Sequence, residues 1–207
     1  MTGQLVIVGC GGFGREVYAI AQTLGWQVLG FVDDSPSPDA HKLVARLGAA
    51  VLGPVDSAPA MPSRPAVAMA IGDPAVRARL VAALDGHSMH FPVLVHPDTT
   101  IGADVALGPG TIVAPGVRLS VNVDVGSHVH LDQNSTIGHD CVISDFARVN
   151  PSACLSGNVT VGTQALIGAN ATVLQGRSVG ARAVVGAGAC VVRDVADDAV
   201  VKGVPAR

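Results

Sequence analysis

One six-residue period runs through the second half of the chain and limits what that half can fold into. From Val95 to Val191, every sixth residue is aliphatic, which makes seventeen consecutive positions. The fourth residue after each aliphatic is small or β-branched, Arg177 excepted, and the residue directly after the aliphatic is glycine eight times. One aliphatic and one small inward position per hexad cannot fill a compact globule, but they suit short strands stacked as a parallel β-helix. Three hexads complete a triangular coil of 18 residues, so residues 95–196 predict between five and six coils.

The composition agrees with a core of small aliphatic side chains. Hydrophobic residues make up 49% of the 207 residues but aromatic residues only 3%, so rings cannot supply most of the buried area. A net charge of −3 gives no basic field, and we therefore expect no nucleic-acid partner. Every apolar run is interrupted well before the roughly 18 residues that cross a bilayer, and the start lacks a basic leader region. We expect no membrane association, reduced cysteines and a cytoplasmic location.

The first 94 residues predict a separate α/β domain, and residues 95–207 form the repeat domain with its C-terminal tail. Apolar runs predict strands over 5–8, 27–32 and 66–71, and helical patterns cover about 15–24 and 74–84. Alternating strands and helices imply a small, Rossmann-like parallel sheet. Residues 35–64 are rich in Pro, Ala and Ser without a clear period, and we expect them to be mostly irregular.

A glycine-rich motif follows the first predicted strand. Gly9, Gly11 and Gly14 satisfy G-x-G-x-x-G, and Asp33 and Asp34 follow about 20 residues later, a layout that cradles a phosphate on backbone N–H groups. The alternatives are a tight turn that needs glycines only for packing, and a dehydrogenase. A single βαβ-like unit is less than the two halves that a dinucleotide spans, which favours a nucleotide attached to another group.

His139 is the residue of the repeat best placed for chemistry. It lies two residues after the inward Ile137, on the outside of the coil, and Gly157 stands one coil later. An imidazole beside a missing side chain leaves a slot where a backbone N–H could bind a developing oxyanion. Neutral imidazole is suited to accepting a proton near neutral pH, and Asp140 could orient it if a turn brings the two together. The alternative is a solvated surface histidine.

Three histidines of the repeat offer a second interpretation, a zinc site, because imidazole is the usual zinc ligand. His128 and His130 are only two residues apart, and a triad with His139 is not evident within one chain, although ligands shared across subunits would change that. We therefore expect no metal, with a zinc-dependent hydratase on the same fold as an alternative.

The hexads, residues 135–143 with the sequence STIGHDCVI, residues 155–159 and the tail 201–206 closely resemble the hexapeptide-repeat acyltransferases. With residues 6–14 and 31–34 in front, nearly the whole chain is similar to the sugar acetyltransferases related to sialic acid O-acetyltransferase and to bacterial nucleotide-sugar 4-amino N-acetyltransferases, including those that act on perosamine.

This resemblance implies a left-handed β-helix, a homotrimer with active sites at the subunit interfaces, and acetyl-CoA lying between neighbouring helices. It implies that His139 is the general base, that Asp140 is its partner and that Gly157 offers its N–H near the thioester. The residues that it implies for the pantetheine channel are Gly168, Ala169, Gly186 and Ala187, and those for the nucleotide are Gly9, Gly11, Asp33 and Asp34. The chain departs from its relatives at Asp132, where asparagine is frequent, and at Arg148, where many have a second histidine.

On this resemblance we expect acetyl transfer from acetyl-CoA to the 4-amino group of a nucleotide-linked deoxy-amino sugar of bacterial surface polysaccharide or lipopolysaccharide. The acceptor would be GDP-perosamine or a UDP-linked equivalent. One alternative is O-acetylation of a sialic acid or another sugar hydroxyl, for which the same base and cosubstrate would serve. Another is a non-catalytic trimeric scaffold whose front domain senses a nucleotide.

Overall fold

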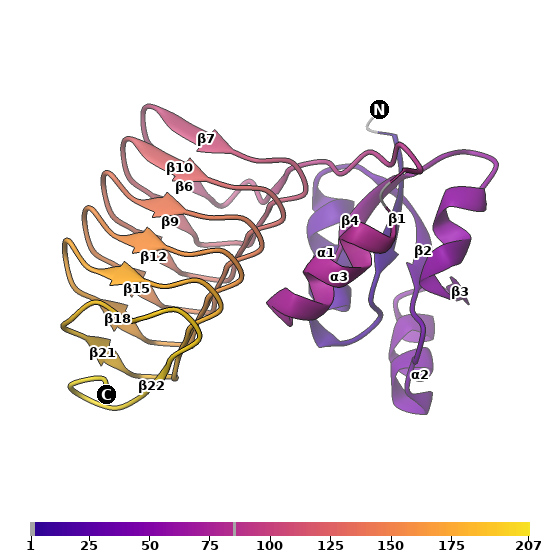
Figure 1. Ribbon diagram of the computed structural model, residues 1–207. Coiled ribbons are helices and arrows are strands. Elements are labelled where there is room, and N and C mark those ends of the chain that lie inside the picture. Colours follow the sequence, from indigo (N-terminus) through magenta and orange to yellow (C-terminus); the bar gives the residue numbers. More distant parts are fainter. Residues whose placement is uncertain (1–2, 85) are drawn as a thin grey trace. The chain divides into compact units, whose positions relative to one another are not determined.

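The computed structural model describes residues 3–84 and 86–207, and its contacts divide the chain into two compact units (Figure 1). The front unit is Met1–Leu94 and the second unit is Val95–Arg207. Each unit has a hydrophobic core of its own, so each is described separately below.

The front unit is a four-stranded parallel sheet with the strand order β3-β2-β1-β4. Its strands are β1 (Gln4–Val8), β2 (Gln27–Val32), β3 (Val51–Gly53) and β4 (Ala66–Met69). Its helices are α1 (Gly12–Thr23), α2 (Pro38–Arg46), the 3₁₀ helix η1 (Val55–Ala60) and α3 (Pro74–Ala83). The expected alternation of strands and helices is present, and all four carboxyl ends of the strands lie at one edge of the sheet.

Both faces of the β1 strand are covered, which explains its uninterrupted apolar sequence. Val6 and Val8 belong to a buried cluster that also contains Val55 of η1 and Leu84. The alternate residues Leu5 and Ile7 are also fully buried, because successive side chains of a strand point to opposite faces.

The expectation that residues 35–64 are mostly irregular is wrong. They contain α2, β3 and η1. Helix α2 is set by its ends: the Ser37 side chain accepts a hydrogen bond from the N–H of Ala40 at 3.1 Å, Pro38 occupies the first turn and Arg46 the last. These are standard start and stop signals, and the helix between them buries Ala40 and Val44, which lie one turn apart on the same face.

The second unit is a three-sided parallel β-helix built from three sheets. The β10 sheet contains β7 (Val105–Leu107), β10 (Val123–Val125), β13 (Val142–Ile143), β16 (Thr160–Val161) and β19 (Ser178–Val179). The β11 sheet contains β5 (Leu94–Val95), β8 (Ile112–Val113), β11 (His130–Leu131), β14 (Arg148–Val149), β17 (Leu166–Ile167), β20 (Val184–Val185) and β22 (Val200–Val201). The β12 sheet contains β6 (Thr100–Ile101), β9 (Arg118–Leu119), β12 (Thr136–Ile137), β15 (Cys154–Leu155), β18 (Thr172–Val173) and β21 (Cys190–Val191).

Strand neighbours differ by 18 residues from β10 to β21, as the hexads predict. Ile137 pairs with Leu155, and Ile143 pairs with Val161. From Val113 to Val191 the aliphatic of each hexad is buried. Before this range the burial is incomplete, since Val95 and Leu107 are partly buried and Ile101 is 42% exposed. The strand of Ile101, β6, is the last of its sheet, so no further coil of that sheet covers it.

The chain turns at three corners of the prism. We call the turns from the β12 to the β10 sheet the first corner, those from the β11 to the β12 sheet the second corner, and those from the β10 to the β11 sheet the third corner. At each corner one residue per coil has a left-handed φ, which explains the frequent Asn, Asp and Gly there. Examples are Asn122 and Asp140 at the first corner, Asn134 at the second and Phe146 at the third.

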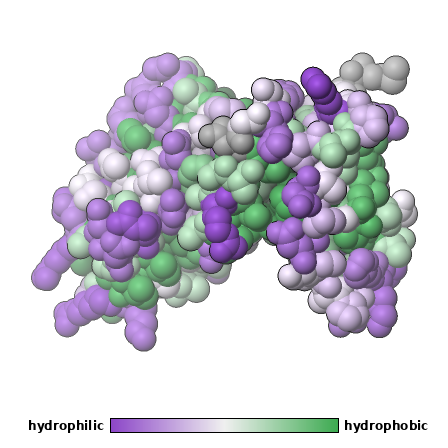
Figure 2. All heavy atoms as spheres, turned by 45° about the vertical axis from the view of Figure 1, so that its right-hand side comes forward, coloured by the Kyte–Doolittle hydropathy of each residue, from purple (hydrophilic) through white to green (hydrophobic). Residues whose placement is uncertain are grey.

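The surface combines charged side chains with scattered apolar ones, and Figure 2 shows the two kinds interspersed over the drawn face. Among the helices described, none has the length and apolar character needed to cross a bilayer.

Candidate active site

His139 lies at the first corner with Asp140 and Asn122 in a hydrogen-bonded row. The Nδ1 atom of His139 is 2.6 Å from Oδ2 of Asp140, and the other carboxylate oxygen of Asp140 accepts a hydrogen bond from Asn122 Nδ2 at 3.0 Å. The left-handed φ of 59° at Asp140 makes the turn that brings two adjacent side chains together. Backbone bonds from Asp140 N to Val121 O and from Asn158 N to His139 O fix this segment to the coils on either side.

The charge state of Asp140 determines which nitrogen of His139 can accept a proton. Hydrogen bonds from His139 and then from Asn122 lower the pKa of the Asp140 carboxyl below its ordinary value, so the carboxylate is ionised at neutral pH. An ionised carboxylate only accepts hydrogen bonds, so Nδ1 of the ring carries the hydrogen and Nε2 of neutral His139 has a free lone pair. Both side chains are half exposed, which leaves Nε2 accessible.

Gly157 lies directly against the His139 ring. A Cβ at position 157 would have the ring atoms Nε2, Cε1 and Cδ2 as its three nearest neighbours, with Cε1 at 2.5 Å. The space beside Gly157, which the sequence predicts to be an open slot, is therefore occupied by the imidazole itself. In the described part of the chain the N–H of Gly157 donates no backbone hydrogen bond, so it remains available to another acceptor.

The structure does not bring all the predicted site residues together within one chain. His139, Asp140 and Gly157 lie at the first corner, whereas Gly168, Ala169, Gly186 and Ala187 lie at the second, after β17 and β20. The width of the β12 sheet separates these two corners. Successive coils pack tightly against each other at the second corner, since a Cβ on Gly168 would lie 2.5 Å from the backbone N of Ala187.

The three histidines of the zinc interpretation lie on different parts of the prism. His128 is at the third corner and stacks on Phe146 with ring centroids 5.2 Å apart, His130 is on β11 and His139 is at the first corner. Within residues 3–84 and 86–207, no group of three His, Cys, Asp or Glu side chains is arranged to hold a metal ion.

The two departures from the resembling family form an ion pair. Nε and Nη2 of Arg148 both lie 2.8 Å from Oδ2 of Asp132, and the two side chains are 17% and 1% exposed. A buried carboxylate is costly without such a partner. Each of the two side chains would therefore be destabilising without the other.

In the front unit, the three glycines of the motif have different local roles. Gly9 has φ of 95° and donates its N–H to Val32 O, and a Cβ on Gly14 would overlap the carbonyl oxygen of Gly9. These two glycines therefore permit the close packing of α1 on β1. Gly11 is the N-cap residue of α1 and makes no side-chain cap, so its end of the helix is open to an anion.

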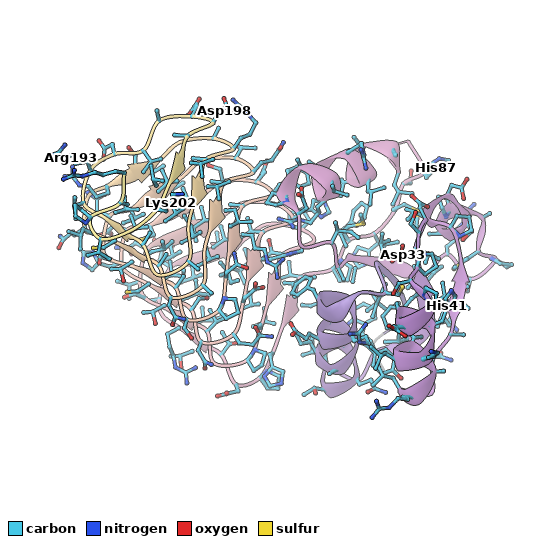
Figure 3. The ribbon with its side chains drawn as sticks, turned by 90° about the horizontal axis from the view of Figure 1, so that it is seen from below. Asp33, His41, His87, Arg193, Asp198 and Lys202 are labelled. Carbon is cyan, nitrogen blue, oxygen red and sulfur yellow. The ribbon has the colours of Figure 1, made fainter. Side chains whose placement is uncertain are left out.

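The two predicted carboxylates also differ. Asp33, which is labelled in Figure 3, accepts hydrogen bonds at both oxygens, from the N–H groups of Cys10 and Ser35 at 2.9 Å. Burial tends to raise the pKa of Asp33, but these N–H groups lower it below its ordinary value. Asp34 accepts one hydrogen bond at Oδ1, from Val55 N at 2.8 Å, and lines a cavity of about 200 Å³ between η1 and α3. Asp33 thus closes the glycine-rich loop, while the second oxygen of Asp34 accepts no hydrogen bond from the residues that the structure describes.

Cys10 supplies a pH-dependent test of this loop. Burial and then the neighbouring Asp33 carboxylate raise the pKa of the Cys10 thiol to about 11. The folded thiol therefore keeps its proton at a pH where the unfolded one has lost it. The free energy of unfolding should be unaffected by this group below pH 9.0 and should fall as the pH rises from 9.0 through about 11. Urea unfolding of the wild type and of C10A over this range measures the effect, and equal slopes for the two proteins would contradict it.

Sequence reasoning missed two supporting residues. Asn122 stands 18 residues before Asp140, so the coil period itself could have identified it. Arg77 of α3 is fully buried and its Nη1 donates to Ile71 O at 2.6 Å, which anchors the loop after β4 beside Gly9. An isolated arginine within a helix gives no sequence signal for this role.

Comparisons with known proteins identify the family and the fold of the chain. Residues 4–84 match the model of the PglD N-terminal domain. No curated protein sequence matches the chain. A mutant of perosamine N-acetyltransferase from Caulobacter crescentus, in complex with CoA and GDP-perosamine, is similar over 100% of this chain and 97% of its own, with 30% identity and a TM-score of 0.91.

Two further solved structures are similar over the whole chain. The acetyltransferase domain of PglB from Neisseria gonorrhoeae, in complex with acetyl coenzyme A, has 27% identity and a TM-score of 0.87, and the match covers 100% of this chain and 99% of that domain. WeeI from Acinetobacter baumannii has 29% identity with the same coverage and TM-score. The likeness confirms the predicted fold class, a small α/β front domain followed by a left-handed parallel β-helix.

Proposed function

The chain belongs to the perosamine N-acetyltransferase-like family of hexapeptide-repeat acyltransferases, and we propose that it acetylates the 4-amino group of a nucleotide-linked deoxy-amino sugar. It is an acetyl-CoA-dependent sugar acetyltransferase. GDP-perosamine, which is bound in the Caulobacter relative, is the first acceptor to test, and a UDP-linked 4-amino sugar is the second.

The observation that carries the proposal is the row Asn122, Asp140, His139. It leaves Nε2 of His139 as the accepting nitrogen, on a ring that lies against Gly157. A base and a hydrogen-bond donor side by side are what acyl transfer to an amine requires.

The reaction is a direct transfer. The sugar amine attacks the thioester carbonyl carbon, a C–N bond forms, and Nε2 of His139 accepts the proton that the nitrogen loses. The N–H of Gly157 donates to the carbonyl oxygen as negative charge develops there. When the C–S bond breaks, the thiolate of CoA leaves and takes up a proton. Asp140 keeps the ring oriented and stabilises the imidazolium.

The separation of the two corners supports active sites at the interfaces of a homotrimer. Acetyl-CoA held at Gly168, Ala169, Gly186 and Ala187 of one chain would reach His139 of a neighbouring chain if the first corner of one packs near the second corner of the other. Val121 and Val142, beside the first corner, are 41% and 43% exposed, and burial of these side chains against another copy would be favourable.

In the front unit we assign the nucleotide to the open helix end at Gly11 and to the free oxygen of Asp34. Gly9 and Asp33 hold the loop in shape, with Asp33 contributing negative charge beside the ligand. Both guanine and uracil carry N–H groups that can donate a hydrogen bond to a carboxylate oxygen, so Asp34 suits either base.

The expected cytoplasmic location of the protein stays a prediction.

An acceptor panel tests the proposal. The purified protein is given acetyl-CoA with GDP-perosamine, a UDP-linked 4-amino sugar or a sialic acid, and thiol release and product mass are followed. We expect acetylation of a 4-amino sugar nucleotide at a rate that a metal chelator does not change. Acetylation of the hydroxyl acceptor alone would favour the O-acetyltransferase alternative, and a chelator-sensitive reaction without thiol release would favour the hydratase.

A further inference from the structure

The front unit has a second concave surface at the edge of the sheet opposite the glycine-rich loop. A cavity of about 330 Å³ is lined by Pro59, Arg64, Pro65, Gly86, His87, Ser88, Met89 and His90. A second cavity, of about 410 Å³, shares Arg64, Pro65 and His90 with it and adds Gly3, Gln4, Trp26, Ser63 and Ala66. We call the two together the Arg64 groove, and both are within the size range of small-ligand sites.

Arg64 and Trp26 lie away from Gly11 and Asp33, but the first cavity of the groove adjoins the cavity that Asp34 lines and shares Pro59 and His87 with it. Arg64 and Pro65 precede β4, Gln4 begins β1 and Trp26 precedes β2, so the groove runs along the amino ends of the parallel strands. Gly11 and Asp33 lie at the carboxyl ends. Strands of four to six residues at about 3.3 Å per residue separate the two edges.

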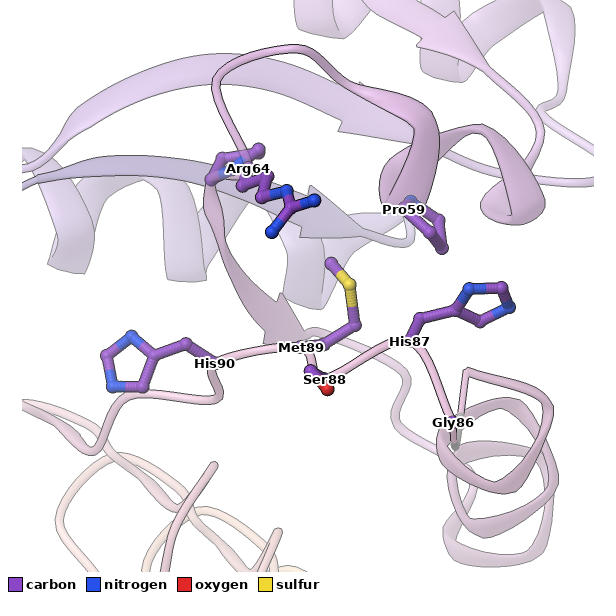
Figure 4. A pocket seen from close by; sticks show the side chains of 8 residues that line it. Pro59, Arg64, Gly86, His87, Ser88, Met89 and His90 are labelled. Atoms are coloured by element: carbon purple, nitrogen blue, oxygen red, sulfur yellow. The ribbon is translucent and has the colours of Figure 1, made fainter.

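The chemistry of the groove is cationic and aromatic. Figure 4 shows the Arg64 guanidinium extending over the cavity above Met89, with His87 on the side of Pro59 and His90 on the opposite side. Among the described residues, no ion pair involves Arg64, and no carboxylate lines either cavity. An arginine fork without a carboxylate partner suits a phosphoryl group.

The backbone of this groove is also unusual. Among the described non-glycine residues of the front unit, only Arg64 and Ser88 have a left-handed φ, of 43° and 51°. Both line the first cavity. Such conformations cost free energy and gather at ligand sites, whereas in the β-helix they recur at every corner for reasons of folding.

We propose that the Arg64 groove binds a small phosphorylated ring compound, a nucleotide or a sugar phosphate. The phosphoryl group lies on the guanidinium of Arg64 with His87 or His90 beside it. The ring lies along the indole of Trp26, which is half-buried at the far end of the groove and offers an apolar face for stacking. Such a ligand would lie next to the acceptor sugar nucleotide, since the first cavity and the Asp34 cavity share Pro59 and His87.

The single tryptophan of the chain makes the groove directly observable. Trp26 fluorescence is titrated with GMP, glucose 1-phosphate, inorganic phosphate and glucose at constant ionic strength. We expect a saturable change with GMP or glucose 1-phosphate, at least about tenfold weaker binding of phosphate, and none with glucose. R64Q should weaken the binding about tenfold or more.

R79Q is the matched control, because Arg79 is an exposed arginine of α3 outside the groove. It should bind as the wild type does, and R64Q should keep the wild-type rate of acetyl transfer. D34A should keep the fluorescence change, which separates this groove from the nucleotide site. Absence of a saturable change, equal effects of R64Q and R79Q, or loss of the change in D34A would overturn the proposal, and calorimetry with W26F repeats the test without the reporter.

Discussion

The variant H139N is expected to lose two to four orders of magnitude in the rate of acetyl transfer while its fold is unchanged. Asparagine can still donate a hydrogen bond to Asp140, but it has no nitrogen lone pair that accepts a proton at neutral pH. Because His139 is half exposed and on the outside of the coil, its loss removes little buried area. Steady-state kinetics with the 4-amino acceptor measures the loss, and sedimentation and thermal unfolding check the assembly and the fold.

The matched control for this variant is H96N. His96 is another histidine of the β-helix, and it lies at the second corner directly after β5, the first strand of the stack. Its Nδ1 accepts a hydrogen bond from Asp98 N, which the asparagine oxygen can replace. H96N should keep the wild-type rate. A rate for H139N within a few fold of the wild type would show that another group accepts the proton.

The β-helix could be predicted from the sequence because every hexad repeats the same pattern of aliphatic and small residues. An aliphatic residue such as Ile137 and a small one such as Cys141 recur at fixed positions in each hexad. Because each coil has three sides of six residues, stacked residues are 18 positions apart. Ile101 departs only because its strand lies at the end of the stack. In the front unit the alternation of strands and helices could be predicted, but α2 was missed. Its start signals Ser37 and Pro38 and its buried face of Ala40 and Val44 span only nine residues within a segment rich in Pro, Ala and Ser.

The candidate site could be predicted in part for the same reason. The position of His139 outside the coil and its neighbour Gly157 follow from the period, and so does Asn122 once the 18-residue ladder is applied. The sequence could not indicate that the ring fills the space beside Gly157, because this depends on the side-chain rotamer. The Asp132–Arg148 pair was visible only as two separate departures, since 16 residues separate partners that one coil brings together.

The variant G157A is expected to reduce acetyl transfer by about a hundredfold, although alanine has no reactive group. A Cβ at position 157 meets the His139 ring and nothing nearer, so the ring must rotate away and carry Nε2 with it. Displacement of a catalytic group by about 1 Å can have an effect of this size. The alanine keeps its N–H, and φ at this position is outside the left-handed region, so neither the oxyanion donor nor the backbone accounts for the loss.

A double-mutant cycle isolates the contact between these two residues. In the wild type, G157A should lower the free energy of unfolding by about 1 kcal/mol, because the His139 ring must rotate away from the added methyl group and loses its hydrogen bond with Asp140. In the H139A background the ring is absent, and the same substitution should be close to neutral for stability. Urea unfolding of the four proteins gives the coupling free energy. An equal cost of G157A in both backgrounds would mean that the ring does not lie over Gly157, and the assignment of Nε2 as the proton acceptor beside the Gly157 N–H would fall with it.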